Sequence, residues 1–226
     1  DTQNLYFDKA LRMMGDVDIY VDQSKQEEAS LVFERLGYLK GDRGPCHTGF
    51  HKGSQEIEVH HNLFRINKEV DRFFDKPFKN SNLVSGNTYK MNNEYYLAYL
   101  LTHYSKHFTR GGSGFRSLID IYLLLKSEHY NIEESRNYLK QIKLDKFFDS
   151  CLGAINYIFE EKYTTHFTGD VNLFLDFCLN SGVHGFRLGN NSRMNEANAM
   201  KASKIKYIFK KTFLPKNQMR EMYKSN

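Results

Sequence analysis

The sequence has little cysteine and proline and no tryptophan. It contains 3 cysteines and 3 prolines in 226 residues. The cysteines (Cys46, Cys151 and Cys178) are odd in number, far apart and in no Cys-x-x-Cys pair. This pattern argues against a disulfide framework and against a cysteine zinc site, and it fits a reducing compartment. We therefore expect a cytoplasmic protein.

Long apolar runs and internal repeats are also missing. No stretch approaches the roughly 18 apolar residues that cross a bilayer, and the start of the chain does not have the pattern of a signal peptide. No repeat of about 20–50 residues is visible. With 40% hydrophobic and 26% charged residues, the chain is not wholly disordered. Its 15 Tyr and 18 Phe predict an aromatic core.

Positive charge is concentrated at the C-terminal end. The net charge is +5, but the segment from Lys201 to Asn226 carries eight basic residues and a single acid, so the rest of the chain is slightly negative. This distribution argues against a protein that binds nucleic acid over its whole surface. Apolar residues such as Ile205 and Phe209 alternate with the lysines. We expect an amphipathic helix with a solvated lysine face, or a contact with an acidic partner, RNA or an anionic membrane.

The first part of the chain predicts a mixture of strands and helices. Residues 16–21 alternate polar and apolar, as in a strand. Residues 24–36 have a helical apolar stripe, with Ser24 as the expected N-cap and Gly37 as the expected C-cap. Residues 46–52 and 55–62 predict two strands joined in a hairpin.

Beyond about residue 65 the pattern becomes helical. The spacing predicts helices over 92–108, 115–127, 132–143, 145–162, 170–180 and 195–213. A stretch rich in Asn, Ser and Gly, residues 80–87, is typical of a linker. We therefore expect an α+β protein, with a small mixed-sheet core over residues 1–80 and a helical domain over residues 81–226 that ends in the basic helix.

Two acids stand two residues apart on the first predicted strand. Asp16 and Asp18 share one face of that strand, because side chains alternate with period 2. Such carboxylates repel each other unless a cation such as Mg²⁺ lies between them. Glu58 lies on a later strand, on the same face as His60, and we expect Arg12 to meet a phosphate. The alternative is a solvated strand end with two surface acids.

Here the sequence resembles a known family. The run from Asn4 to Val21 is similar to the Arg-x-x-Gly-Asp-hydrophobic-Asp segment of an uncharacterised bacterial nucleotidyltransferase-like family, within the DNA polymerase beta nucleotidyltransferase superfamily. Further segments resemble that family in the same order along nearly the whole chain: Leu36-Gly-Tyr38, Ile57-Glu-Val-His60, residues 101–107 and 114–122, and Phe213-Leu-Pro215 with Tyr223.

The resemblance implies a nucleotidyltransferase-like core and a set of site residues. Asp16, Asp18 and Glu58 would be the catalytic carboxylates and the ligands of Mg²⁺ or Mn²⁺. Arg12 and His60 would support the site by binding nucleotide or phosphate, and we expect the same of Gly15. His103, His107 and Arg116 are further candidates for contact with the metal ligands or with the acceptor. The substrate would be a nucleoside triphosphate such as ATP. The acceptor could be a sugar, a small molecule, a peptide or a protein.

One feature of that superfamily is missing from this sequence. A Gly-Ser or Lys-Gly turn normally precedes the Asp-x-Asp strand and holds the triphosphate. Only 15 residues precede Asp16 here, and they contain no such turn. We expect that turn to lie upstream of Asp1 in the natural protein. The glycines of residues 111–114 follow the Asp pair and lack a P-loop Lys-Ser/Thr, so we expect a turn between helices there.

Two further functions remain open. The first is a catalytically inactive binding module that keeps the nucleotidyltransferase fold. The second is a zinc hydrolase that uses His60, His61, His103 and His107. His103 and His107 are one helical turn apart, but the sequence between them lacks the Glu of a metalloprotease helix, so a structural role is the simpler interpretation. For Arg116 and Asp120, four residues apart, we expect a structural ion pair.

Overall fold

The computed structural model describes residues 2–12, 15–110, 114–127 and 130–159, together with Val171, Phe174, Leu175, Cys178 and Leu179. The chain divides into two compact units, Gln3–Pro77 and a second that begins at Phe78. The first combines a sheet with helices and the described part of the second is mostly helical, which confirms the α+β class. Within the described residues, no helix has the length and apolar character to cross a membrane.

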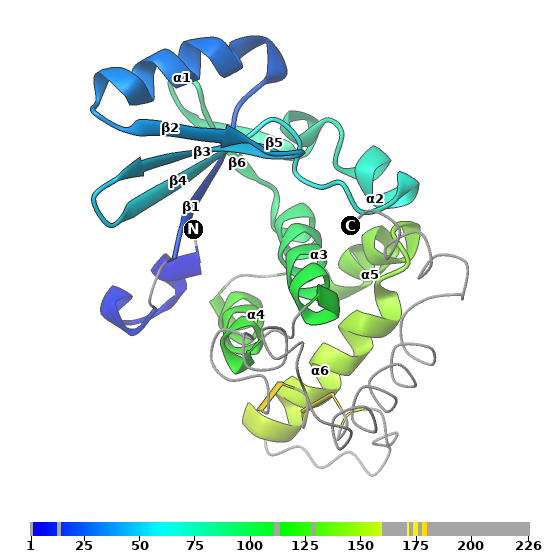
Figure 1. Cartoon of the computed structure of the whole chain (residues 1–226). Helices are drawn as coiled ribbons and strands as arrows, with labels where there is room; N and C mark the ends of the chain where they lie inside the picture. Colours follow the sequence, from blue (N-terminus) through cyan, green and yellow to red (C-terminus); the bar gives the residue numbers. More distant parts are fainter. Residues whose placement is uncertain are drawn as a thin grey trace, which may run out of the picture. The chain divides into compact units, whose positions relative to one another are not determined.

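A four-stranded mixed sheet forms the centre of the first unit (Figure 1). Its spatial order is β1-β4-β3-β2, with β1 parallel to β4 and the other neighbours antiparallel. The strands are β1 Val17–Tyr20, β2 Leu39–Arg43, β3 His47–Lys52 and β4 Gln55–His60. The predicted strand at 16–21 and the predicted hairpin are confirmed. The strand β2 was not expected, because its sequence, LKGDR, is short, charged and interrupted by glycine.

One face of this sheet is apolar and carries a helix. Helix α1, Gln26–Arg35, lies along the sheet (Figure 1), and the ring centroids of Phe33 on α1 and Phe50 on β3 are 5.0 Å apart. Phe50 and Val59 are almost completely buried. Since successive side chains of a strand point to opposite faces, the residues directly before and after Phe50 and Val59 on their strands lie on the other face. That other face carries the acids and histidines discussed below.

The two ends of α1 differ in how well the sequence predicted them. Ser24 is not the N-cap. Lys25 occupies that position and makes no side-chain cap hydrogen bond. Asp22 instead caps the turn before the helix: its Oδ1 accepts hydrogen bonds from the Ser24 backbone N–H at 2.9 Å and from the Ser24 hydroxyl at 2.6 Å. A single 3₁₀ turn, Gln23–Lys25, therefore precedes the helix. Gly37 ends the helix as expected, with a φ of +84° and with its N–H donating to the carbonyl of Glu34 at 3.0 Å.

Shorter helical segments flank the sheet along the chain. Two 3₁₀ turns, Thr2–Leu5 and Lys9–Leu11, precede β1. Helix α2, Lys68–Phe73, follows β4, and the side chain of Asn67 caps it by accepting the Val70 N–H at 3.0 Å. A 3₁₀ turn, Pro77–Asn80, comes next.

The stretch that resembled a linker is a β-hairpin. Strands β5, Ser81–Ser85, and β6, Thr88–Met91, pair antiparallel. Gly86, with a φ of +52°, lies in the turn between them. The linker prediction was wrong because the Asn, Ser and Gly residues that suggested it belong to this turn and to two exposed strands. The boundary predicted at residue 80 stays a prediction.

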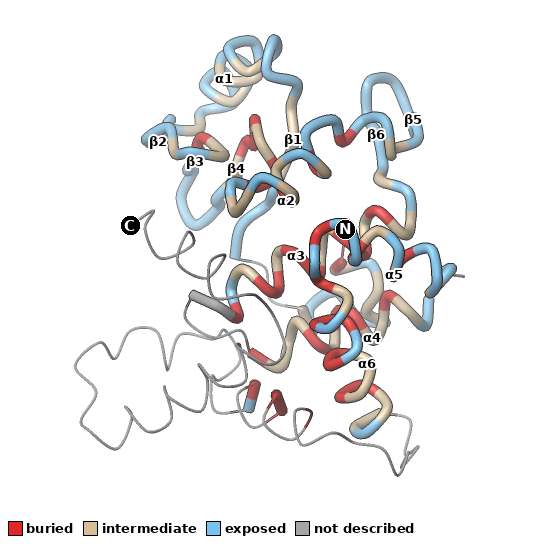
Figure 2. The backbone as a smooth tube through the Cα atoms, turned by 90° about the vertical axis from the view of Figure 1, so that its right-hand side faces the viewer, coloured by how far each residue is buried: buried red, intermediate tan, exposed pale blue. Residues whose placement is uncertain are grey.

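Four long helices complete the described part of the second unit: α3 Asn93–Arg110, α4 Phe115–Ser127, α5 Ile132–Gln141 and α6 Asp145–Phe159. Each of them carries buried residues, shown in red in Figure 2. Phe147 is fully buried, and its ring centroid is 5.2 Å from that of Tyr104 and 5.6 Å from that of Phe108.

These four helices agree with the predictions. The predicted helix at 195–213, the basic segment from residue 201 and the glycines 111–113 lie outside the described residues, and so does most of the predicted helix at 170–180.

Candidate functional site

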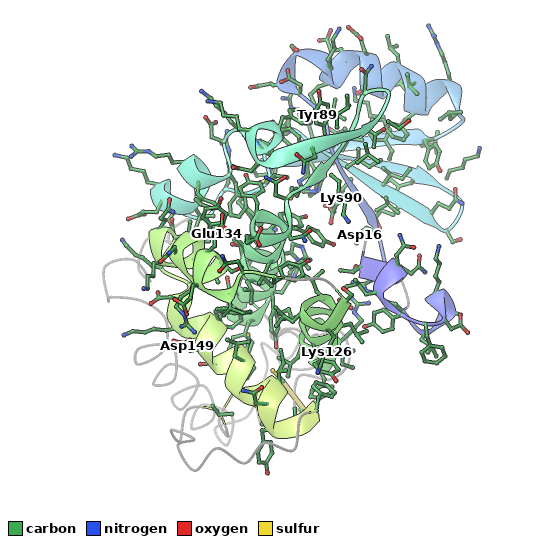
Figure 3. All side chains as sticks on the ribbon, turned by 180° about the vertical axis from the view of Figure 1, so that it is seen from behind. Asp16, Tyr89, Lys90, Lys126, Glu134 and Asp149 are labelled. Atoms are coloured by element: carbon green, nitrogen blue, oxygen red, sulfur yellow. The ribbon has the colours of Figure 1, made fainter. Side chains whose placement is uncertain are left out.

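The polar face of the sheet brings three carboxylates together. Asp18 on β1 is in register with Glu58 on β4, so both side chains project from the same face. Asp16 stands directly before β1 (Figure 3). One carboxylate oxygen from each of Asp16, Asp18 and Glu58 lies within 4.8 Å of the other two. The structure therefore assembles the predicted acidic cluster from two neighbouring parallel strands.

This concentration of negative charge affects protonation. The pKa of Asp16 is raised, first by loss of solvent around the carboxyl group and then by the charges of Asp18 and Glu58. A bound cation would remove this repulsion. Because all three groups offer oxygen ligands, the cluster fits a hard ion such as Mg²⁺ or Mn²⁺.

His60 lies against this cluster and is buried. Its Nε2 is 2.8 Å from Asp18 Oδ1 and 3.2 Å from Glu58 Oε2, and its Nδ1 is 3.2 Å from the carbonyl oxygen of Asn62. Burial alone would lower the pKa of His60. The hydrogen bonds to Asp18 and Glu58 outweigh burial and raise the pKa from 6.5 to about 9. In the metal-free protein an imidazolium therefore bridges the two carboxylates.

His47 also belongs to this face, and the sequence reasoning did not include it. Its Nδ1 is 3.2 Å from Glu58 Oε2, and it stands opposite His60 in the β3–β4 pair. The sequence contained a signal that could have identified it. A two-residue turn at Gly53-Ser54 pairs Lys52 with Gln55, and counting back along both strands then pairs position 47 with position 60.

Arg12 and Gly15 lie next to the cluster in sequence. Arg12 directly follows the 3₁₀ turn Lys9–Leu11. Gly15 adjoins Asp16, and a β-carbon added there would meet no atom of the described residues within 4 Å, its chain neighbours aside. The structure thus leaves open space beside the start of β1. The predicted role of both residues in phosphate binding stays a prediction.

The remaining predicted residues, His103, His107 and Arg116, belong to the second unit. His103 and His107 lie one turn apart on α3, with their Nε2 atoms 3.2 Å apart. Arg116 lies on α4, one turn before the buried Asp120. Their predicted part in the site stays a prediction.

The Nε2 atom of His61 contacts the protein backbone. That atom is 3.1 Å from the carbonyl oxygen of Pro45, and burial, followed by the charge of Arg43, lowers the pKa of His61. A neutral ring that donates its Nε2 proton to Pro45 is the consistent state. The zinc hydrolase alternative, which groups His61 with His60, His103 and His107, stays a prediction.

Comparison with known proteins adds one match. The sequence profile of a protein family described as uncharacterised nucleotidyltransferase matches residues 2–160. This region contains the carboxylate cluster and all of the helices α3 to α6, the last of which ends at Phe159. No curated protein and no solved structure shows significant similarity to the chain.

Proposed function

Because the chain belongs to the uncharacterised nucleotidyltransferase family, we propose that it transfers a nucleoside monophosphate from a nucleoside triphosphate to an acceptor hydroxyl at the Asp16–Asp18–Glu58 cluster. The observation that carries this proposal is the approach of the three carboxylates to within 4.8 Å on one sheet face. The acceptor belongs to one of four classes: a sugar, a small molecule, a peptide or a protein.

The three carboxylates are the groups that would hold Mg²⁺ or Mn²⁺. When bound, such an ion supplies positive charge to the triphosphate and to the attacking and leaving oxygens. Asp16 and Asp18 stay exposed while Glu58 is half-buried. The two aspartates are thus accessible to a triphosphate. His47 and His60 each lie 3.2 Å from Glu58 Oε2 and hold that carboxylate in place.

In the proposed reaction the acceptor oxygen attacks the α-phosphorus. A new bond forms between them, and the bond from the α-phosphorus to the oxygen that bridges to the β-phosphate breaks. Pyrophosphate leaves with that electron pair, and the hydroxyl proton passes to Glu58 or to water. The chain contributes position and charge complementarity. We assign Arg12 and Gly15 to the triphosphate side, because they adjoin Asp16 in sequence.

The test uses the full-length protein with Mg²⁺ and each labelled nucleoside triphosphate. Asp18→Asn and Glu58→Gln remove one charge each from the cluster, and we expect transfer to fall by about 100-fold or more. Glu56→Gln is the matched control. Glu56 lies on the same strand and the same face as Glu58, but it is exposed and lies beside His51 at 3.9 Å. We expect this control to keep its activity.

The outcomes separate the candidate functions. Equal activity in the wild-type protein, Asp18→Asn and Glu58→Gln would refute the proposed site. Binding of the nucleotide with Mg²⁺, measured by calorimetry, without transfer to any acceptor class would indicate the binding module. If the full-length protein shows neither binding nor transfer, the proposed function is wrong.

A further inference from the structure

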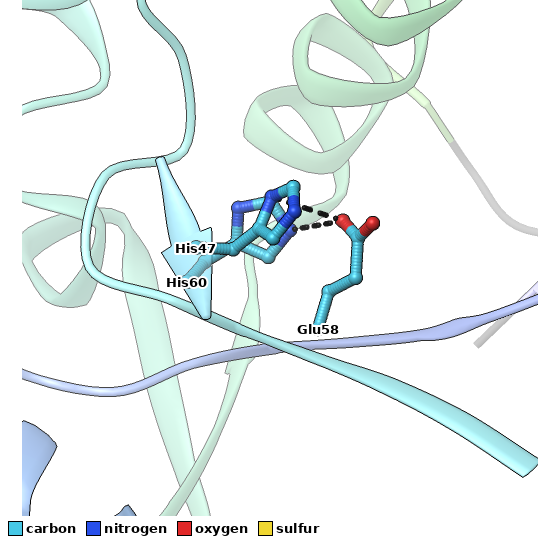
Figure 4. A group of neighbouring side chains, drawn as sticks. All are labelled: His47, Glu58 and His60. Atoms are coloured by element: carbon cyan, nitrogen blue, oxygen red, sulfur yellow. Dashed lines mark hydrogen bonds and ion pairs between the residues drawn. The ribbon is translucent and has the colours of Figure 1, made fainter. Parts of the chain in front are cut away.

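A second group of ligand atoms lies beside the three carboxylates. His47, Glu58 and His60 come from the adjacent strands β3 and β4, and Figure 4 shows both imidazole rings directed at the Glu58 carboxylate. Their ligand atoms also lie within 4.8 Å of one another. The proposed transfer reaction uses His47 only to hold Glu58, and it makes no use of the two imidazole rings as metal ligands.

The distances fit a small metal ion. Both His47 Nδ1 and His60 Nε2 are 3.2 Å from Glu58 Oε2. Ligands at the usual zinc distances of about 2.0–2.1 Å are separated by about 3.3 Å in a tetrahedral site. These two separations are therefore close to those of a tetrahedral edge, and the ligand atoms of His47 and His60 lie within 4.8 Å of each other.

The environment of His60 favours the same role. Its Nδ1 is 3.2 Å from the carbonyl oxygen of Asn62, so the Nδ1 proton has an acceptor. Its Nε2 then faces the carboxylates of Asp18, at 2.8 Å, and Glu58, at 3.2 Å. Metal-binding histidines are commonly held in this way, with the second ring N–H donated to a carbonyl. The backbone after β4 therefore fixes both the tautomer and the orientation of the ring.

We propose that His47, Glu58 and His60 form a transition-metal site that selects Zn²⁺ over Mg²⁺. Two imidazole nitrogens suit Zn²⁺, whereas Mg²⁺ prefers an all-oxygen shell. Two histidines and a glutamate leave a fourth position open, as in catalytic rather than structural zinc sites. Glu58 belongs to both groups, so its two oxygens can serve neighbouring ions. The inference does not depend on the transfer reaction.

Calorimetry on the untagged full-length protein tests the site. The protein is treated with EDTA and dialysed, then titrated with ZnCl₂ in excess Mg²⁺ and without nucleotide. We expect one equivalent of Zn²⁺ to bind, and His47→Gln to weaken binding at least about 10-fold. His51→Gln is the matched control, because His51 lies on the same strand and face but beside Glu56. We expect its Zn²⁺ affinity to equal that of the wild-type protein.

Several results would overturn the inference: less than roughly half an equivalent of bound Zn²⁺, unchanged affinity in His47→Gln, or equal losses in both histidine variants. X-ray absorption of the zinc-loaded wild-type protein needs no variant and remains informative if His47→Gln does not fold. We expect two imidazole ligands, and a shell of oxygens alone would refute the site. Failure here leaves the nucleotide assay standing, since that assay uses Mg²⁺ and the carboxylate variants.

Discussion

His60 carries a positive charge between two carboxylates in the metal-free protein. The hydrogen bonds to Asp18 and Glu58 raise its pKa from 6.5 to about 9, and its side chain is only 10% exposed. Because the folded protein binds this proton more tightly than the unfolded chain, the stabilisation is complete below about pH 6.5. It is lost as the pH rises towards 9.

We therefore expect the EDTA-treated protein to become less stable between pH 6.5 and about 9. The shift corresponds to up to about 3 kcal/mol in the free energy of unfolding. Urea unfolding at a series of pH values measures it, and His60→Gln should flatten the dependence in this range. His51→Gln, on the neighbouring strand, should retain the wild-type curve. If His60→Gln and the wild-type protein showed the same slope, the assignment of the charge to His60 would be wrong.

At the same scale, the sequence predicted some residues of the cluster and missed others. Asp16, Asp18 and Glu58 were identified because period-2 alternation and a family resemblance both act on local sequence. His47 was missed because its place beside His60 follows from the register between β3 and β4. The alternation of side chains along a single strand gives no information about that register. The alternation shows which residues share a face, and the turn shows which strand positions are neighbours. Both are needed to predict a site that spans several strands.

At the scale of the element, Gly37 determines how α1 passes into β2. Its φ of +84° lies in the left-handed region, where a β-carbon is unfavourable by about 1–2 kcal/mol. We expect Gly37→Ala to lower the free energy of unfolding by that amount, as measured by urea unfolding. Gly44→Ala is the control, because Gly44 does not have a positive φ and its added carbon would be 3.5 Å from the nearest atom. Equal losses in the two variants would contradict the expectation.

The elements themselves were predictable to different degrees. The helices α3 to α6 have long apolar stripes, and this periodicity gave their positions within a few residues. The hairpin β5–β6 was not predicted, since its strands are short and exposed, with Leu83 at 59% and Val84 at 63%. Such strands depend on backbone pairing rather than on burial, so they lack the alternation that identifies a half-buried strand.

At the scale of the whole molecule, two compact units each have an apolar core of their own. In the first, Phe50 and Val59 pack under α1. In the second, Phe147 is fully buried among aromatic rings that include Tyr104, Phe108 and Phe174. A separate core allows one unit to open locally without the other, because local unfolding follows cooperative groups of packed elements.

Phe147→Ala tests this independence. We expect the variant to destabilise the second unit by about 3–5 kcal/mol, through lost burial and the cavity left behind. Hydrogen exchange followed by mass spectrometry should show faster exchange in α3 to α6 and unchanged protection in β1 to β4. Tyr157→Ala, at a position on α6 that is 44% exposed, should change exchange much less. Equal loss of protection in the sheet and the helices would instead mean that the two units unfold together, so that damage to the helical core would also release the residues of the carboxylate cluster.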